Sequence, residues 1–324
     1  MYYVVTGAAG FIGSKIVEAL NAAGVTDIVA VDNLQQSDKV RNLSGLEIAD
    51  YLDQAEFLQR LDSFDGALEA VLHQGACSDT MESDGRYMME NNYRYSKRLL
   101  DWCQEAEVAL LYASSASVYG AGPDFREERA CERPLNVYGY SKFLFDQLVR
   151  RTLARRTAQI AGFRYFNVYG PNEAHKGRMA SVALHAYQQL LAAGRVKLFV
   201  GSGGYGNGEQ RRDFVYVDDV VDVNLWFLEH RQVCGIYNCG TGRAQSFNQL
   251  AAATINAAQG TRLTAKELAE KGLIEYVAFP EGLRDRYQSF TEADLSRLRT
   301  AGYAGEFKSV EQGVSAYVAH LQKQ

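Results

Sequence analysis

Two residues four positions apart, Tyr138 and Lys142, have side chains that could carry acid–base chemistry. On a helix, positions i and i+4 lie on one face a turn apart, so the phenol and the ammonium would be neighbours. Free tyrosine has a pKa of about 10, and a nearby positive charge favours the phenolate. A tyrosine with a lowered pKa can take a proton from an alcohol or return one to a carbonyl. The pair therefore predicts a proton-transfer site, although this spacing alone arises by chance in many helices.

A glycine-rich loop near the start of the chain gives this pair a context. Gly7, Gly10 and Gly13 stand between a strand predicted over residues 2–5 and a helix predicted over residues 12–20. In such loops the first glycine permits a tight turn, the second lets the backbone approach a pyrophosphate, and the third lets helix and strand pack closely. Asp32 ends the next predicted strand, roughly 20 residues on, where an acid can bind an adenosine ribose. This succession of strand, glycine loop, helix and acidic residue predicts a dinucleotide-binding site, and a purely structural glycine turn is the weaker alternative.

Composition limits the remaining possibilities. The 324 residues are 47% apolar, enough for one large domain or two closely associated ones. A net charge of −5 argues against general binding of nucleic acid or of a membrane surface. No signal peptide and no apolar run of about 20 residues is apparent. Five scattered cysteines predict reduced thiols and a cytoplasmic location, and the histidines have no ligand spacing, so no metal site is predicted.

The predicted elements alternate between strand and helix. This alternation predicts an α/β fold with a doubly wound parallel Rossmann-type sheet and a smaller mixed α/β substrate lobe. We expect residues 1–166 to form the dinucleotide-binding domain and residues 167–324 the interleaved lobe, with helices of the second half packing back on the first. Further strands are expected at 46–48, 70–73, 109–113, 159–166 and 236–239, and helices at 53–61, 84–105, 138–153, 246–258 and 309–322.

Ser115 is a third candidate for the chemistry, because it follows the strand predicted at 109–113. A hydroxyl at a strand end can hold a substrate alcohol close to a phenol. Taken alone, a serine in this place more often satisfies backbone groups of a turn. The glycine loop and the Tyr138–Lys142 pair reverse that preference.

These three elements resemble the extended short-chain dehydrogenase/reductase family. Longer matches resemble the ADP-L-glycero-D-manno-heptose 6-epimerase branch of nucleotide-sugar enzymes, and they run nearly end to end. They lie at residues 75–78, 90–93, 134–146, 163–171, 175–177, 212–217 and 224–229.

The resemblance implies a reaction and a homo-oligomer, a pentamer in the family. The family inverts C6 of the heptose in ADP-D-glycero-D-manno-heptose, a precursor of the lipopolysaccharide inner core. Bound NADP takes hydride from C6 and returns it to the other face of a transient ketone. Tyr138 would be the first acid/base group and Lys176 the second, with Lys142 orienting the nicotinamide ribose and lowering the pKa of Tyr138.

The resemblance also implies binding residues. The cofactor contacts carried over are Gly7, Gly10, Phe11, Ile12, Gly13, Asp32, Asn33, Lys39, Gln74, Gly75, Ala76, Cys77, Ser78, Asn91, Tyr138, Lys142, Val168 and Lys176. The substrate contacts carried over are Asn167, Arg178, His185, Phe199, Val200, Gly201, Ser202, Arg212 and Tyr287. A guanidinium at Arg212 can clamp a diphosphate.

Several residues depart from the family pattern and leave alternatives open. Arg178 stands where the family often has serine, and the loop at 201–210 is longer than usual. Asp32 favours NAD, whereas Lys39 could pair with the 2′-phosphate of NADP, which the family prefers. Another nucleotide-sugar epimerase or dehydratase, or a non-catalytic dinucleotide sensor, is the alternative function. The residue after Ser115 is alanine, which argues against a dehydratase.

Overall fold

The structure is a computed structural model that describes residues 1–280 and 288–323. The chain forms two compact units. The first unit contains residues 1–165, 220–239 and 296–305, and the second contains residues 166–219, 240–295 and 306–324. Within the described ranges, no helix combines the length and the apolar character needed to cross a membrane.

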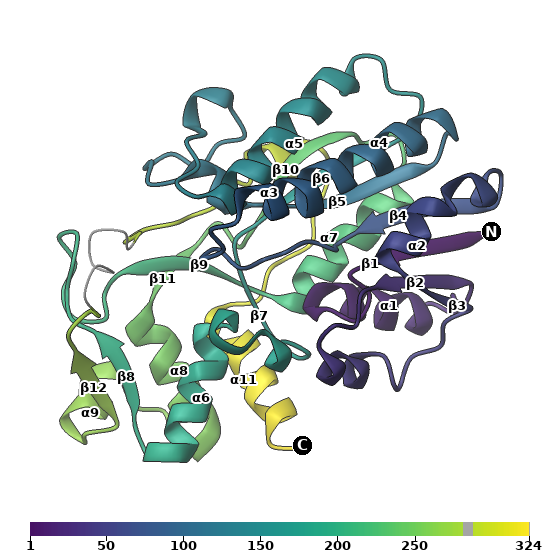
Figure 1. The fold of residues 1–324 in the computed structure, drawn as a ribbon. Coiled ribbons are helices and arrows are strands. Elements are labelled where there is room, and N and C mark those ends of the chain that lie inside the picture. Colours follow the sequence, from purple (N-terminus) through teal and green to yellow (C-terminus); the bar gives the residue numbers. More distant parts are fainter. Residues whose placement is uncertain (281–287, 324) are drawn as a thin grey trace. The chain divides into compact units, whose positions relative to one another are not determined.

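The first unit is built on a seven-stranded parallel sheet, which confirms the predicted doubly wound fold (Figure 1). Its strand order is β10-β6-β5-β4-β1-β2-β3. The central strands are almost continuously apolar and buried, as expected of a sheet covered on both faces. The strand bounds are β1 (Tyr2–Thr6), β2 (Ile28–Asp32), β3 (Asp50–Asp53), β4 (Leu68–His73), β5 (Ala109–Ser115), β6 (Ile160–Tyr165) and β10 (Gly235–Cys239).

The strand predicted at residues 46–48 is wrong, because the edge strand β3 starts only at Asp50. Of its four residues, only Leu52 is buried. An edge strand is covered less completely than a central one, so it needs fewer apolar side chains and leaves a weak pattern in the sequence. The apolar residues Leu46 and Ile48 precede the strand in the connection that leads to it.

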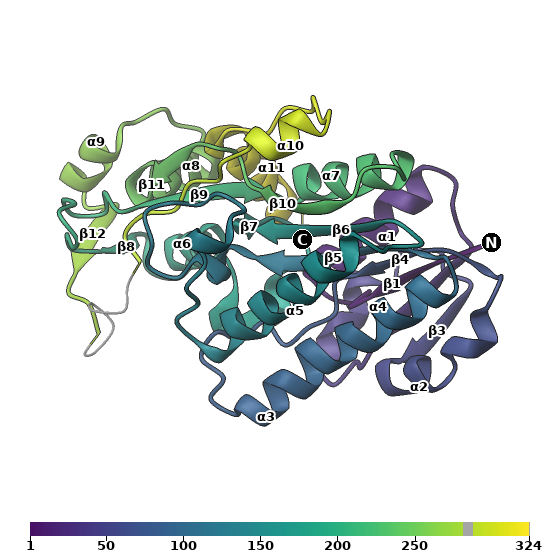
Figure 2. The same ribbon diagram turned by 90° about the horizontal axis from the view of Figure 1, so that it is seen from above.

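Helices lie on both faces of this sheet. Side chains of α2, α4 and α5 share one buried cluster with the strands, and α7 lies on the opposite face (Figure 2). Strand order reverses at β1, so right-handed crossovers put α1 on the face opposite to α4. The helix bounds are α1 (Phe11–Ala22), α2 (Gln54–Gln59), α3 (Gly85–Met88), α4 (Tyr95–Glu105), α5 (Val137–Leu153), α7 (Val217–Glu229) and α10 (Ser296–Thr300). Short 3₁₀ turns are η1 (Ser37–Asn42), η2 (Leu61–Phe64), η4 (Ala116–Tyr119) and η5 (Arg129–Cys131).

The helix predicted over residues 84–105 is interrupted. Between α3 and α4 the chain forms a π-helical segment, η3 (Met89–Arg94). A π segment widens the helix locally and changes which side chains face inward, and such segments are frequent at functional sites. Here it turns Asn92 inward, leaving 2% of that residue exposed.

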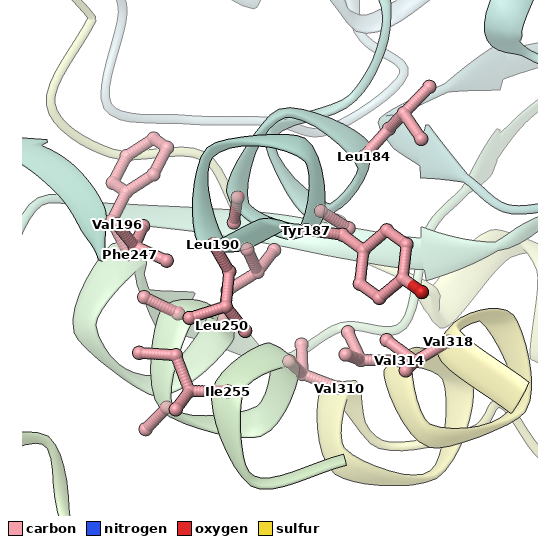
Figure 3. Packing of buried hydrophobic residues seen from close by; sticks show 14 of the residues in the cluster. Leu184, Tyr187, Leu190, Val196, Phe247, Leu250, Ile255, Val310, Val314 and Val318 are labelled. Carbon is pink, nitrogen blue, oxygen red and sulfur yellow. The ribbon is translucent and has the colours of Figure 1, made fainter. Parts of the chain in front are cut away.

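The second unit has its own sheets and core. One sheet has the order β11-β9-β7 and the other pairs β12 with β8. Apolar side chains from α6, α8, α11 and β8 form one cluster, which includes Leu184, Tyr187, Leu250, Ile255 and Val314 (Figure 3). The element bounds are β7 (Asn167–Tyr169), η6 (Ala174–Met179), α6 (Val182–Ala193), β8 (Val196–Phe199), β9 (Arg211–Tyr216), β11 (Ala244–Ser246), α8 (Phe247–Gln259), α9 (Ala265–Glu270), β12 (Ile274–Val277) and α11 (Val310–Leu321).

A buried charge cluster joins three elements of the first unit. Arg164 on β6 is 0% exposed, and its Nε donates to Asp146 Oδ2 of α5 at 2.9 Å. The same guanidinium is paired with Glu132. Asp146 also accepts the hydroxyls of Tyr112, at 2.9 Å, and Ser114, at 3.0 Å, both on β5. Because the charges are buried, these ion pairs and hydrogen bonds offset much of the cost of removing them from water.

Replacing Arg164 with methionine tests the importance of this cluster. Arg164→Met leaves the buried Asp146 without its cation and removes one of the two arginines from Glu132, which keeps Arg150. We therefore expect a loss of about 3–5 kcal/mol in the free energy of unfolding. Arg94→Met is the control, because Arg94 pairs with Glu90 on the surface and such pairs contribute less than about 1 kcal/mol. Urea denaturation followed by circular dichroism measures both variants. Equal midpoints would contradict the assigned role of Arg164.

Candidate active site

The predicted phosphate-binding loop forms a tight backbone cradle between β1 and α1. Gly7 has φ +66°, and a Cβ added there would lie 2.7 Å from the nitrogen of Gly75. A Cβ on Gly13 would lie 2.1 Å from the carbonyl oxygen of Gly7. The loop and the first turn of α1 therefore pack at a distance that only glycine permits. The amides that begin α1 form a helix N-terminus, a place suited to a phosphate group.

Asp32 and Lys39 meet at the end of β2. Lys39 Nζ lies 2.8 Å from Asp32 Oδ1, and the ion pair is mostly buried. The same carboxylate accepts the amides of Ala9 at 3.1 Å and Asn33 at 2.8 Å. Tyr51 completes the arrangement by donating its hydroxyl to the carbonyl oxygen of Asp32 at 2.7 Å. The acid predicted to bind ribose is thus held firmly against the glycine loop, with a cation beside it.

The segment after β4 carries the predicted contacts Gln74 to Ser78, and Asn92 from η3 holds it in place. Asn92 Oδ1 accepts the amide of Cys77 at 2.8 Å, and its Nδ2 donates to the carbonyl oxygen of Cys77 at 2.9 Å. Asn91, the residue carried over from the family, donates to Asn92 Oδ1 at 3.1 Å. Gln74 Oε1 accepts the hydroxyl of Tyr165 at 3.0 Å. In the sequence, Asn92 lay within the family match at residues 90–93, but only Asn91 was carried over from it as a cofactor contact.

The structure brings Ser115 and Tyr138 together at the end of β5. Asn136 caps α5 by accepting the amide of Gly139 at 2.8 Å, so Tyr138 falls in the first turn of the helix. The Ser115 side chain lies close enough to the Tyr138 phenol to oppose the rise in its pKa that burial causes, and the Ser115 Oγ accepts the amide of Ser117 at 3.1 Å. A strand end and a helix start thus bring the two residues together, and their catalytic roles stay predictions.

Lys142 lies one turn beyond Tyr138 and is buried. Its Nζ donates to the carbonyl oxygen of Ala113 at 2.9 Å. Burial lowers the pKa of Lys142 to about 8, and the negative charge of Asp146 opposes that shift. Nearby, His73 is bonded to Thr6 at 2.6 Å and to Ser96 at 2.8 Å. Burial and the charge of Lys142 lower the pKa of His73 to about 3, so this ring is neutral at physiological pH.

The predicted lowering of the Tyr138 pKa is wrong for this structure. Burial raises the pKa of Tyr138 above its usual value of 10, and the nearby Ser115 side chain only partly opposes the rise. The ammonium of Lys142 is directed at the Ala113 carbonyl. Sequence spacing correctly placed the lysine one turn away, but it carried no information about the loss of water around the phenol. The phenol is consequently protonated at neutral pH.

The second unit carries the remaining predicted residues. Asn167 and Val168 lie on β7, Lys176 and Arg178 on η6, and His185 on α6. Burial lowers the pKa of Lys176, while the charge of Glu173 opposes the shift. Phe199 ends β8 and is followed by Val200, Gly201 and Ser202. Tyr287, also predicted to contact substrate, lies outside the described residues.

Arg212 lies on β9. The buried carboxylate of the next residue, Asp213, anchors this strand to other segments of the second unit. The carboxylate of Asp213 accepts the amides of Thr241 at 2.7 Å, Gly242 at 2.9 Å and Ala293 at 3.0 Å. Two distant chain segments thereby converge on the residue next to Arg212. The Arg212 guanidinium itself lies 5.8 Å above the ring of Phe247. The sequence shows that Asp213 follows Arg212, but it could not show which backbone groups Asp213 binds, because they lie tens of residues away along the chain.

The long loop after β8 is tied to the start of α8. Gln210 Nε2 donates to the Val200 carbonyl at 2.9 Å and to Ser202 Oγ at 3.1 Å. Asn248 Nδ2 donates to the Asn207 carbonyl at 2.9 Å. The predicted contacts at 200–202 are thus part of a hydrogen-bonded loop.

Comparisons with known proteins agree with this geometry. The family model described as NAD dependent epimerase/dehydratase matches residues 3–240. ADP-L-glycero-D-manno-heptose-6-epimerase of Thiobacillus denitrificans is 64% identical over 326 residues, which cover 99% of this chain and 98% of the relative.

Two solved structures extend the comparison. The crystal structure of Helicobacter pylori ADP-L-glycero-D-manno-heptose-6-epimerase has a TM-score of 0.83 at 28% identity, covering 100% of this chain and 96% of the other. The Thermus thermophilus UDP-glucose 4-epimerase complex with NAD has a TM-score of 0.77 at 26% identity, covering 99% of both chains. The chain therefore belongs to the NAD dependent epimerase/dehydratase family, in the branch of the ADP-L-glycero-D-manno-heptose-6-epimerases.

Proposed function

We propose that this protein epimerises C6 of the heptose in ADP-D-glycero-D-manno-heptose, giving ADP-L-glycero-D-manno-heptose for lipopolysaccharide inner-core synthesis. The main support is the arrangement of Ser115 beside Tyr138, with Lys142 one turn further along α5. The chain is also 64% identical to a relative named for this activity. A homo-oligomer, a pentamer by the resemblance, and a cytoplasmic location remain predictions.

The residues of the first unit fit a nicotinamide dinucleotide. The glycine cradle leaves no room for a Cβ at Gly13 and presents the start of α1 to a pyrophosphate. Asp32 and Lys39 are suited to the adenosine ribose and to a phosphate on it, respectively. When bound, the cofactor supplies a hydride acceptor and donor. The chain itself must therefore move the proton of the C6 hydroxyl.

Tyr138 is the proposed first proton carrier. Since its pKa is raised, the resting phenol holds its proton at neutral pH and can donate it to the ketone oxygen in the reduction half of the cycle. The proton that the C6 hydroxyl loses in the oxidation half goes to the neutral amine of Lys176. Ser115 lies beside the same phenol and is suited to hold the substrate oxygen near it. Lys142, with a pKa of about 8, is largely protonated at pH 7 and stabilises the phenolate that remains after proton transfer.

Lys176 is the proposed second proton carrier. Inversion requires hydride return to the opposite face of the ketone, so the oxygen occupies two positions and a second acid/base group is useful. Burial lowers the pKa of Lys176, which brings it closer to the range in which a lysine exchanges protons at neutral pH. Arg212 is the proposed partner of the ADP diphosphate, because a guanidinium binds phosphate oxygens in pairs.

Direct assay of the purified chain tests the proposed function. We expect ADP-D-glycero-D-manno-heptose to be converted to a mixture of its C6 diastereomers, with no net oxidation, as seen by proton NMR. UDP-glucose is the comparison substrate, because the T. thermophilus structure belongs to a 4-epimerase. Conversion of UDP-glucose alone would replace the proposal by a 4-epimerase, and cofactor binding without any conversion would favour a sensor.

Tyr138→Phe should bind cofactor normally and lose epimerisation by roughly 10²–10⁴-fold in kcat, since only the hydroxyl is removed. Tyr140→Phe is a matched control on the same helix. Tyr140 is 46% exposed, and position 144 is leucine, so it has no lysine one turn on. Steady-state kinetics and cofactor titration measure both variants. A Tyr138→Phe enzyme with the rate of Tyr140→Phe would rule out the assigned role.

Cofactor preference is proposed to be for NADP, with Lys39 paired to its 2′-phosphate. Lys39→Met should then weaken NADP binding by about tenfold or more, about 1.4 kcal/mol, and leave NAD binding nearly unchanged. Lys97→Met is the control, because it removes the same charge from an exposed pair with Asp101 on α4. Isothermal titration calorimetry with both cofactors measures the effect. Equal weakening of NAD and NADP would show that Lys39 does not discriminate between them.

A further inference from the structure

A buried carboxylate, Glu173, lies three residues before Lys176 and is 0% exposed. Its two oxygens accept the amide of Gly170 at 3.2 Å, the hydroxyl of Ser181 at 2.6 Å and the amide of Ser181. Tyr317, from α11, lies close enough for the charge of Glu173 to add to the rise that burial causes in the pKa of its phenol. A buried carboxylate is costly unless it is fully hydrogen-bonded or near a positive charge, so this set of donors indicates a specific role.

These bonds tie together the two ends of the turn that carries Lys176. Gly170 follows β7, and Ser181 is the N-cap of α6, where its Oγ accepts the amide of Leu184 at 3.2 Å. Between these ends, the amide of Lys176 donates to the Glu173 carbonyl at 2.9 Å. Both the side chain and the backbone of Glu173 therefore determine the path of the turn.

Glu173 also acts on Lys176 electrostatically. Burial lowers the pKa of the lysine, and the negative charge of Glu173 favours the ammonium and limits the decrease. Other ionisable groups near the pair are His175 and Arg178 on the same turn, and Tyr317 on α11.

We propose that Glu173 is the positioning residue of Lys176: its carboxylate holds the 170–181 turn and supplies the negative charge that acts on the Lys176 ammonium. The catalytic part of this inference rests on the proposed function, in which Lys176 carries a proton. Glu173 itself does not touch the substrate in this scheme.

Glu173→Gln tests the charge, because it keeps the size of the side chain. We expect kcat for heptose epimerisation to fall on the order of 10²-fold with KM little changed, as for a displaced proton-transfer group. The limb of the pH profile that belongs to Lys176 should move to lower pH, since the ammonium loses its stabilising anion. Glu173→Asp, which keeps the charge, should recover part of the rate.

A double-mutant cycle distinguishes positioning from a loss of fold. If Glu173 acts through Lys176, Glu173→Gln combined with Lys176→Met should be no slower than Lys176→Met alone. Thr264→Ala is the folding control, because it removes an N-cap and capping box at α9 in the same unit. Additive losses in the double variant, or a rate loss in Thr264→Ala at an equal fall in melting temperature, would overturn the proposal.

A measurement independent of turnover separates this inference from the proposed function. The pH dependence of acetylation at Lys176, followed by mass spectrometry, reports its pKa in the wild-type and Glu173→Gln proteins. A lower pKa in the variant supports the link between the two residues even if the wild-type protein does not epimerise the heptose. An unchanged pKa refutes the link even if epimerisation is confirmed.

Discussion

The fully buried ion pair between Arg164 and Asp146 determines the geometry on which the rest of the first unit depends. Asp146 is the meeting point of β5, β6 and α5, because it binds Tyr112 and Ser114 of β5 as well as Arg164. Buried charges tolerate little displacement, since an unpaired one is costly. The cluster thus fixes the relative position of the β5 end and the start of α5, and with it the distance from Ser115 to Tyr138.

Burial also decides the charge states around this pair. It favours the neutral form of every ionisable group, so it raises the pKa of Tyr138 and lowers those of His73 and Lys142. Lys142 keeps an anion, Asp146, one turn further on, which moderates its shift. The outcome is a neutral phenol and a neutral imidazole beside an ammonium. Of these three groups, Lys142 is thus the one that carries a charge at neutral pH.

The second unit uses a buried carboxylate in two places to hold a segment next to a cation. Asp213 gathers backbone amides from two distant segments beside Arg212, and Glu173 closes the turn that carries Lys176. Carboxylates suit this task because each oxygen accepts more than one hydrogen bond from backbone groups. In both places the cation proposed to meet the substrate lies within three residues of the acid that orders its segment.

The sequence by itself determined the features that depend on local spacing. The glycine loop, the alternation of strands and helices, and the placing of Lys142 one turn after Tyr138 all follow from neighbours within a few residues, and the structure contains each of them. Only the tertiary structure decided the start of β3, the anchoring role of Asn92, the partners of Asp146 and Glu173, and the direction of the Tyr138 pKa shift. These features depend on burial and on contacts between distant segments. Burial and contacts between distant segments arise only when the chain folds, so the sequence pattern alone could not predict them.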